Sequence, residues 1–405
     1  MRDVRVSSLN SDSTSTRNPQ IGALICLMFL ITTVGFVRAS AATEFRATSQ
    51  FDSFDDKLPE GSWSQVENWG GQMPRTAADV GIIGRGRSLS AGYPLGQAGD
   101  RPVIQIDPGG TLWFAHDFDQ PLRLNGGQLR ESPRRKDLCG SDIEITADST
   151  ITSQTNNDDA GRMRLAGKIW NSKPHILTLG GEIQWMTDAH STLSTTLSIA
   201  NGTLYLFDVS DTSKLGSGDL WLYPQTRLYL RGNRADRFCR LINNISGTGS
   251  LRAGDHPESF ALSASGITLH PGLPGQAGTL SVMGNFGFEP GTANQPFNKI
   301  VIEVHGPGTF VEQDYSQLVL RGRLTDSLNT VDLELMVDPN LAPEEVQQYS
   351  LNVMSITDTD ITRFKPFHSV LIRQGQKTGS AQVLFQANTV VSGSSVHVVG
   401  INLPN

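Results

Sequence analysis

Apolar and polar residues alternate in short segments along the middle of the chain, and most of these segments follow a turn that contains glycine. Nine such segments lie between residues 103 and 283. The clearest are Gly202-Thr-Leu204-Tyr-Leu206, Gly218-Asp-Leu220-Trp-Leu222 and Thr226-Arg-Leu228-Tyr-Leu230. An alternation with a period of two is typical of a β-strand that buries one face. The pattern therefore predicts a series of short strands.

A single strand of this kind cannot bury its leucines, so the segments must stack on one another. Their spacing fits a coil of ~20 residues, in which the apolar residues of successive coils form one continuous core. We expect an all-β fold with a right-handed parallel β-helix (solenoid) over residues 103–284. A β-sandwich or jelly roll is the main alternative, but it gives no reason to repeat one Gly-x-Leu-x-Leu phrase.

The two flanks of this array have a different pattern. Residues 43–102 begin with a polar, poorly periodic lead-in (43–57), and continue with Trp63 and Trp69 on a glycine-rich turn, which suits a cap over the first coil. Residues 285–405 contain longer and irregularly spaced strands, typical of a small antiparallel β module that follows the solenoid. A helical turn is expected within 342–348 of that module.

The first 42 residues have the layout of a secretory signal peptide. An uncharged apolar run over residues 21–36 follows several arginines and precedes the small residues Ala39-Ser-Ala-Ala42. The run is short for a membrane of ~30 Å, and the small residues suit signal peptidase, so we expect cleavage after Ala41 or Ala42. The mature protein would then be secreted or at the cell surface, with no transmembrane span. An uncleaved N-terminal anchor is the alternative.

The composition limits the classes of binding partner that we expect and the possible states of the cysteines. The formal net charge is −7, so there is no overall positive field to attract nucleic acid, and we expect no nucleic-acid partner. The mature chain keeps two cysteines, Cys139 and Cys239, which are compatible with one disulfide or with two buried thiols. The short basic cluster at Arg134–Lys136 is typical of a solvated loop.

The motifs of the common enzyme classes are absent from the sequence. It has no His-Glu-x-x-His, no Gly-x-Ser-x-Gly and no phosphate-binding glycine loop. The acidic groups Asn156–Asp159 and Asp208 with Asp211 follow strand-like segments and are interpreted as polar turns. The histidines, His116, His175, His190 and His270 among them, are scattered and interpreted as isolated surface residues. We therefore expect no catalytic residue, no metal site and no cofactor.

Aromatic residues give the one specific hypothesis about binding. If the leucines of residues 204–230 point inward, alternation turns Tyr205, Phe207, Trp221, Tyr223 and Tyr229 outward on neighbouring coils. Aromatic faces stack on sugar rings, so Tyr205, Trp221, Tyr223 and Tyr229 are candidate contacts for a glycan or another partner. The alternative is that these rings pack beneath a loop or against another molecule.

Four passages resemble autotransporter-passenger-like β-solenoid proteins with autotransporter-associated β-strand repeats. They are the Trp…Asn-Trp…Gly…Pro…Asp opening of Trp63–Ile83, the Gly-Thr-Leu and Leu-Gly-Ser-Gly phrases within residues 202–230, residues 269–284, and Asp314–Gly322. The resemblance implies a surface-exposed solenoid. An autotransporter also needs a C-terminal translocator barrel, and residues 285–405 have no room for one.

Two functions follow as expectations. The first is an exported structural or adhesive protein of the bacterial surface or extracellular space, without catalysis, whose partner is a surface polysaccharide or another surface protein. The alternative is a carbohydrate-binding or carbohydrate-active β-helix, such as a polysaccharide lyase or hydrolase. An enzyme of this kind should gather carboxylates, or carboxylates with Lys or Arg, in one place, whereas a scaffold should have a Ser/Thr/Asn-rich exterior.

Overall fold

The computed structural model describes residues 42–49, 62–114, 117–131, 138–153, 162–186, 193–232, 238–255, 260–290, 297–306, 310–326, 328–359, 367–388 and 393–403. Residues 42–405 form one compact unit. The expected signal peptide lies outside the described residues except for its last residue, Ala42. In the ranges given above, no helix has the length and apolar character that a membrane span requires.

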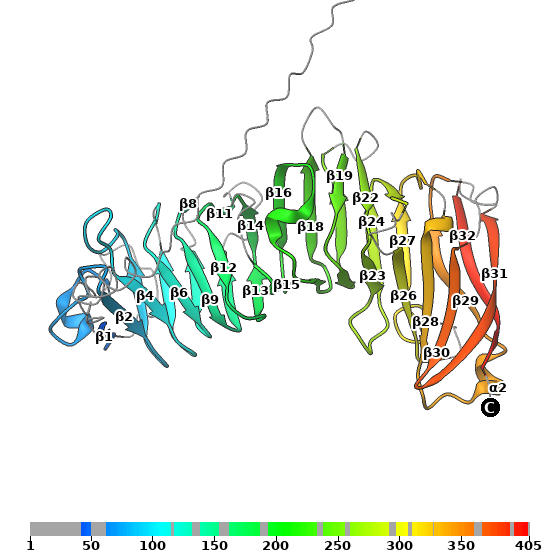
Figure 1. Cartoon of the computed structure of the whole chain (residues 1–405), viewed down its shortest axis with the longest axis horizontal. Coiled ribbons are helices and arrows are strands. Elements are labelled where there is room, and N and C mark those ends of the chain that lie inside the picture. Colours follow the sequence, from blue (N-terminus) through cyan, green and yellow to red (C-terminus); the bar gives the residue numbers. More distant parts are fainter. Residues whose placement is uncertain are drawn as a thin grey trace, which may run out of the picture. The chain divides into compact units, whose positions relative to one another are not determined.

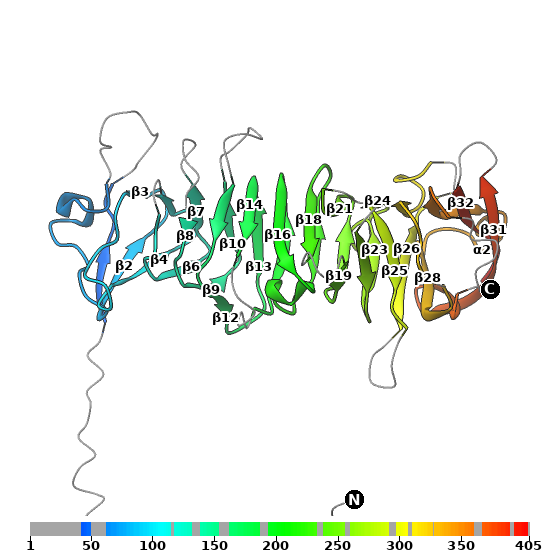
Figure 2. The ribbon, with the colours of Figure 1, turned by 90° about the horizontal axis from the view of Figure 1, so that it is seen from above.

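The unit is an almost entirely β structure in which strands stack in chain order (Figure 1), an order also visible at right angles to that view (Figure 2). A six-stranded sheet contains β1 (Thr43–Arg46), β2 (Asp79–Ile83), β4 (Val103–Ile106), β6 (Leu122–Asn125), β9 (Ile143–Ala147) and β12 (Ile169–Asn171). A three-stranded sheet contains β19 (Phe238–Leu241), β22 (Ala261–Ala264) and β25 (Asn285–Phe288).

Two long ladders of strands accompany these sheets. The β3–β30 ladder contains β3 (Ser88–Ala91), β5 (Thr111–Phe114), β7 (Gln128–Glu131), β10 (Ser149–Thr152), β13 (Ile176–Gly180), β15 (Thr196–Ile199), β17 (Leu220–Leu222), β20 (Ile245–Gly247), β23 (Thr268–Pro271), β26 (Asn298–Val304), β28 (Val331–Val337) and β30 (Ser369–Gln374). The β8–β32 ladder contains β8 (Leu138–Cys139), β11 (Met163–Leu165), β14 (Glu182–Trp185), β16 (Thr203–Val209), β18 (Arg227–Gly232), β21 (Ser250–Ala253), β24 (Thr279–Met283), β27 (Gln317–Arg321), β29 (Ser350–Ile356) and β32 (Gly393–Asn402). Strand β31 (Lys377–Asn388) joins the two ladders.

The pairing of these strands is that of a parallel β-solenoid. From β8 onward, successive coils add a strand to each long ladder. In the six-stranded sheet, Ile104 pairs in parallel with Leu122, which pairs with Ile143, so one coil takes about 20 residues. The strand pairs are parallel from β1 to β30, whereas β29–β32, β30–β31 and β31–β32 are antiparallel. The predicted all-β solenoid with a C-terminal antiparallel part is therefore confirmed.

Inward-facing apolar residues form continuous columns along both ladders. In the β8–β32 ladder, eight residues that pair in register are each at most 2% exposed: Met163, Ile183, Leu204, Leu228, Leu251, Val282, Leu320 and Ile356. Burying one such side chain stabilises the fold by roughly 1.5–3 kcal/mol. Since each residue packs on the coil before and after it, the core is continuous from the N-terminal cap to the last strands.

The parallel array begins earlier and ends later than the sequence predicted. Residues 43–46, expected to be a frayed lead-in, form strand β1, and parallel pairing continues past residue 284 through β28 and β30. The strands of a parallel ladder are joined by backbone hydrogen bonds, and these do not affect the alternation of apolar and polar side chains along each strand. The alternation beyond residue 285 therefore gave no means of telling parallel from antiparallel pairing.

Two tryptophans and the short helices complete the chain. Trp63 precedes the helix η1 (Val66–Trp69) and Trp69 ends it; both are buried in the N-terminal core, and each indole donates a hydrogen bond to a backbone carbonyl. The other helices are η2 (Thr212–Leu215), η4 (Leu328–Thr330) and α2 (Pro343–Val346), the last within the predicted helical turn. Cys139 and Cys239 are free thiols in the core, where burial raises the pKa of Cys139 to about 11 and that of Cys239 to about 12.

Gly202 shows how closely the coils approach at a turn. Its φ is +76°, and a Cβ there would lie 2.3 Å from the carbonyl oxygen of Gly181 on the coil before it. We predict that Gly202→Ala lowers the free energy of unfolding by about 2–5 kcal/mol. A left-handed alanine accounts for about 1–2 kcal/mol of this loss and the steric overlap for about 1–3 kcal/mol. Urea unfolding measures the change.

Gly86 is the matched control for this substitution. Its φ is +68°, but no heavy atom lies within 4 Å of the position that a Cβ would take. Gly86→Ala should therefore show the backbone cost alone, about 1–2 kcal/mol. Equal losses in the two variants would contradict the close stacking of the turns at Gly181 and Gly202.

Candidate functional site

Tyr205 and Tyr229, two of the four predicted contact residues, lie side by side on the outer surface of the β8–β32 ladder. Tyr205 on β16 pairs with Tyr229 on β18, and the flanking leucines of both strands point into the core. The two rings are 5.3 Å apart, and Phe207 lies 5.8 Å from each of them. All three rings therefore lie on the outer side of their strands, but only Tyr205 and Phe207 are partly exposed, whereas Tyr229 is buried beneath neighbouring groups at 6% exposed.

Arginine side chains cover these rings. The guanidinium of Arg162 lies 3.8 Å from the centre of the Tyr205 ring and 5.3 Å from that of Phe207. The guanidinium of Arg231 lies 4.4 Å from the Phe207 ring. Such stacking is favourable because the negative face of an aromatic ring attracts a cation. We call this group, Arg162, Tyr205, Phe207, Arg227, Tyr229 and Arg231, the arginine–aromatic patch.

The hydroxyl groups of both tyrosines are engaged by carboxylates. Tyr205 donates a hydrogen bond to Glu182 at 2.5 Å, and Tyr229 donates one to Asp255 at 2.6 Å. Burial and then the adjacent carboxylate raise the pKa of each tyrosine, so both phenols keep their protons at neutral pH. Glu182 and Asp255 therefore each point toward a tyrosine hydroxyl.

Trp221 and Tyr223 do not belong to this patch. Trp221 lies on β17 in the β3–β30 ladder, where it pairs with Ser198 on one side and Ser246 on the other. Tyr223 lies in the turn after β17, and its carbonyl accepts hydrogen bonds from Thr226. The four predicted contacts are therefore divided between two ladders. Alternation along one strand does not reveal which ladder that strand joins.

A column of uncharged polar residues runs through Trp221. Nine residues pair in register on successive strands of the β3–β30 ladder, and none is Asp, Glu, Lys or Arg: Ser88, Thr111, Gln128, Thr150, Thr178, Ser198, Trp221, Ser246 and His270. We call them the Ser/Thr column. Their spacing is that of neighbouring strands, about 4.8 Å.

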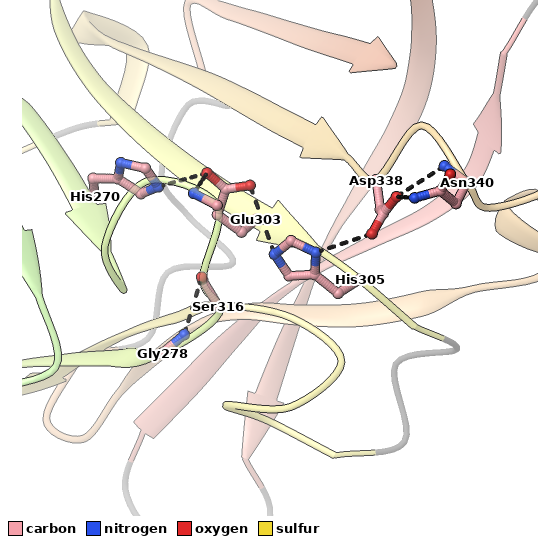
Figure 3. A network of polar contacts seen from close by, with 8 residues as sticks. His270, Gly278, Glu303, His305, Ser316, Asp338 and Asn340 are labelled. Carbon is pink, nitrogen blue, oxygen red and sulfur yellow. Dashed lines mark hydrogen bonds and ion pairs between the residues drawn. The ribbon is translucent and has the colours of Figure 1, made fainter. Parts of the chain in front are cut away.

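At the end of this column, histidines and carboxylates alternate over three strands (Figure 3). His270 Nε2 lies 3.0 Å from Glu303 Oε1, and the other oxygen of Glu303 lies 3.8 Å from His305 Nε2. His305 Nδ1 is 3.5 Å from Asp338 Oδ2, and Asp338 also accepts hydrogen bonds from Asn340. The interpretation of His270 as an isolated surface histidine is wrong, because it is 9% exposed and paired.

The carboxylates of this network are held in their charged form. Burial alone raises the pKa of Glu303, but hydrogen bonds from His270 and the Gly275 amide, together with the nearby histidines, outweigh it and lower that pKa. The backbone amide of Asn340 lowers the pKa of Asp338, and His305 adds to this effect. The network thus ties β23, β26 and the turn after β28 together electrostatically.

The remaining candidates from the sequence are separate from these groups or have structural roles. Asp211 caps the helix η2 by accepting a hydrogen bond from the Ser213 amide at 2.9 Å, which confirms its interpretation as a turn residue. Asp208 is exposed, 3.8 Å from Arg231. His175 lies 3.9 Å from Asp148. Predictions for residues 134–136, 156–159, His116 and His190 lie outside the described residues.

Sequence reasoning missed the charged residues of both groups. Arg227 and Arg231 stand two positions before and after Tyr229, and Glu303 and His305 are also two apart, so alternation places each pair on one side of its strand. That spacing was the available signal. Among the described residues, no three His, Cys, Asp or Glu side chains are grouped to hold a metal ion, and the expectation of no cofactor stays a prediction.

Comparisons of the chain with protein-family models, with curated proteins and with solved structures give no match. The resemblance to autotransporter passengers therefore stays a prediction. The function has to be argued from the surfaces of the solenoid.

The charged state of Glu303 gives a prediction about stability and pH. We expect Glu303→Gln to lower the free energy of unfolding at pH 7 by about 1–3 kcal/mol, because a buried charge-assisted hydrogen bond is lost. The folded-state pKa is lowered, so the contribution is complete above the usual Glu value, 4.5, and disappears as pH falls through the folded-state pKa. Urea unfolding of both proteins between pH 7 and low pH measures this.

The exposed Glu344 offers a control for the same substitution. Glu344→Gln should change stability by less than about 0.5 kcal/mol at every pH. A difference between Glu303→Gln and the parent protein that grew as the pH was lowered would contradict the assignment of Glu303 as a stabilising carboxylate.

Proposed function

We propose that this protein is an exported, non-catalytic β-solenoid that acts as a structural or adhesive protein of the bacterial cell surface or extracellular space. Its partner in this proposal is a surface polysaccharide or another surface protein. The apolar run over residues 21–36 and the small residues before Thr43 support export. The exterior of the solenoid supports the adhesive role.

The Ser/Thr column is the observation that carries this proposal. Hydroxyl and amide groups repeat there on successive strands, with one aromatic ring, Trp221, among them. Such groups exchange hydrogen bonds with water for hydrogen bonds with a partner at little cost, whereas acid–base catalysis needs titratable groups directed at one reacting atom. Four members of the column are buried, and the partly exposed ones are Thr111, Gln128, Thr150, Thr178 and Trp221. This uncharged exposed part of the column suits contact with an extended partner.

A carbohydrate-active enzyme is the second candidate, and the arginine–aromatic patch favours it. Carboxylates and arginines meet on one surface there, which is the arrangement expected for a β-helix lyase or hydrolase. Against this, Glu182 and Asp255 each accept a hydrogen bond from a tyrosine. A catalytic carboxylate must instead be available to the proton or carbon that reacts.

Export can be tested on the full chain with its own first 42 residues. Expressed in a bacterium with a Sec pathway, the protein should be recovered from the periplasm, the cell surface or the medium, with Ala42 or Thr43 as its first residue. N-terminal sequencing of the fractionated protein measures both. A cytoplasmic protein that begins at Met1 would contradict the proposal.

Adhesion and catalysis are separated by one experiment on the mature protein. Incubated with a panel of immobilised bacterial and plant polysaccharides and with whole cells, the protein should be retained on at least one surface while releasing no sugar. Retention is read by immunodetection, and catalysis by new reducing ends or unsaturated products. Product release that is lost in Glu182→Gln would establish the enzyme instead, and retention on no surface would contradict the adhesive role.

A further inference from the structure

We infer that the arginine–aromatic patch binds a linear acidic polysaccharide, one whose sugars carry carboxylate groups. The inference rests on the proposed function and names the class of partner for one surface of the solenoid. It is carried by three arginines that make no hydrogen bond or ion pair within the described part of the chain, by the aromatic rings that lie against two arginines, and by the excess of arginines over carboxylates among the described residues of this surface.

The arginines of the patch are largely free of protein acceptors. Within the described residues, the side chains of Arg162, Arg164 and Arg227 make no hydrogen bond and no ion pair. Glu182 and Asp255, two carboxylates of this surface, are engaged by tyrosine hydroxyls. Guanidinium groups without acceptors on a protein surface are available to bind an external anion.

Stacking fixes the orientation of these groups. The guanidinium carbon of Arg162 lies 3.8 Å from the centre of the Tyr205 ring and that of Arg231 lies 4.4 Å from the centre of the Phe207 ring, so an aromatic ring covers one side of each guanidinium group. The N–H donors lie in the guanidinium plane, so stacking leaves them free to form the paired hydrogen bonds that a carboxylate accepts. An arginine held in this way loses less conformational entropy when it binds.

The charge of the surface is opposite to that of the whole chain. Among the residues that the structure describes, the patch and its neighbours in register supply five arginines, Arg162, Arg164, Arg227, Arg231 and Arg252, and three carboxylates, Glu182, Asp208 and Asp255. The chain as a whole has a net charge of −7. A negative protein repels a densely charged nucleic acid, while a local cationic surface attracts a polymer with one carboxylate per sugar.

The geometry suits a linear polymer. Arg164, Gln184, Tyr205, Tyr229 and Arg252 pair in register on five successive strands, which gives a row of about 19 Å from end to end. Donors at both ends of this row, with rings between them, match a chain of several sugars whose carboxylates repeat along its length.

The experiment uses polygalacturonate and its fully methyl-esterified form, which share one backbone but differ in charge. Isothermal titration calorimetry with the mature protein should detect binding of polygalacturonate only, and the affinity should fall as NaCl is raised from about 0.05 M to about 0.5 M. Arg162→Gln combined with Arg227→Gln should weaken binding at least roughly tenfold. Thermal unfolding confirms that each variant is folded.

Arg130 provides the matched control. Its guanidinium also stacks on an aromatic ring, 5.0 Å from the centre of Trp113, and its Nε is also buried without a hydrogen-bond partner, but it lies on β7 of the other ladder. Arg130→Gln should leave the affinity for polygalacturonate unchanged within about twofold. An equal loss in this variant would show nonspecific attraction and would overturn the proposed site.

Three further results would overturn the inference: no binding of polygalacturonate and alginate at millimolar sugar, equal binding of the esterified polymer, or tighter binding of a DNA fragment of equal charge. These outcomes are distinct from failure of the proposed function. If the protein is exported and retained on cells but ignores both acidic polymers, the adhesive role stands and only this class of partner falls.

Discussion

The packing of apolar side chains between successive coils is the interaction on which the whole molecule depends. Each short strand has only one apolar face, and that face is covered only when another coil stacks on it, as in the column that contains Leu204, Leu228 and Leu251. Backbone hydrogen bonds of the parallel ladders then fix the register of each coil on the next. Removing one coil would expose both of its neighbours.

This constraint leaves the outward positions free to differ between surfaces. In the Ser/Thr column of the β3–β30 ladder, six of the nine residues are serine or threonine, whereas arginines and tyrosines gather on the outer face of β16 and β18 in the β8–β32 ladder. Both surfaces rest on the same kind of leucine column. Their chemistry can therefore change without loss of the core, which is how one solenoid can support contact surfaces of different character.

Charged groups on the solenoid are stabilised in two ways. In the network of Glu303 and its histidines, carboxylates and imidazoles lie within short polar contact of one another across three strands, and the result is structural cohesion. In the arginine–aromatic patch, Arg162 and Arg231 are held chiefly by aromatic rings, which satisfy the charge only in part. In the Glu303 network the polar groups pair with one another inside the protein. In the arginine–aromatic patch, hydrogen-bond donors of the arginines are left for a partner.

The sequence by itself determined the strand-rich coil, its length of about 20 residues and the inward or outward direction of residues such as Leu204 and Tyr205, because alternation is a local property of the chain. Only the tertiary structure decided which strands became neighbours. It separated Trp221 from Tyr205 and Tyr229, brought His270 to Glu303 across 33 residues, and extended parallel pairing past residue 284. Which strands pair depends on how each coil, whose length varies, returns to stack on the coil before it. The local alternation of apolar and polar residues gives no information about that return.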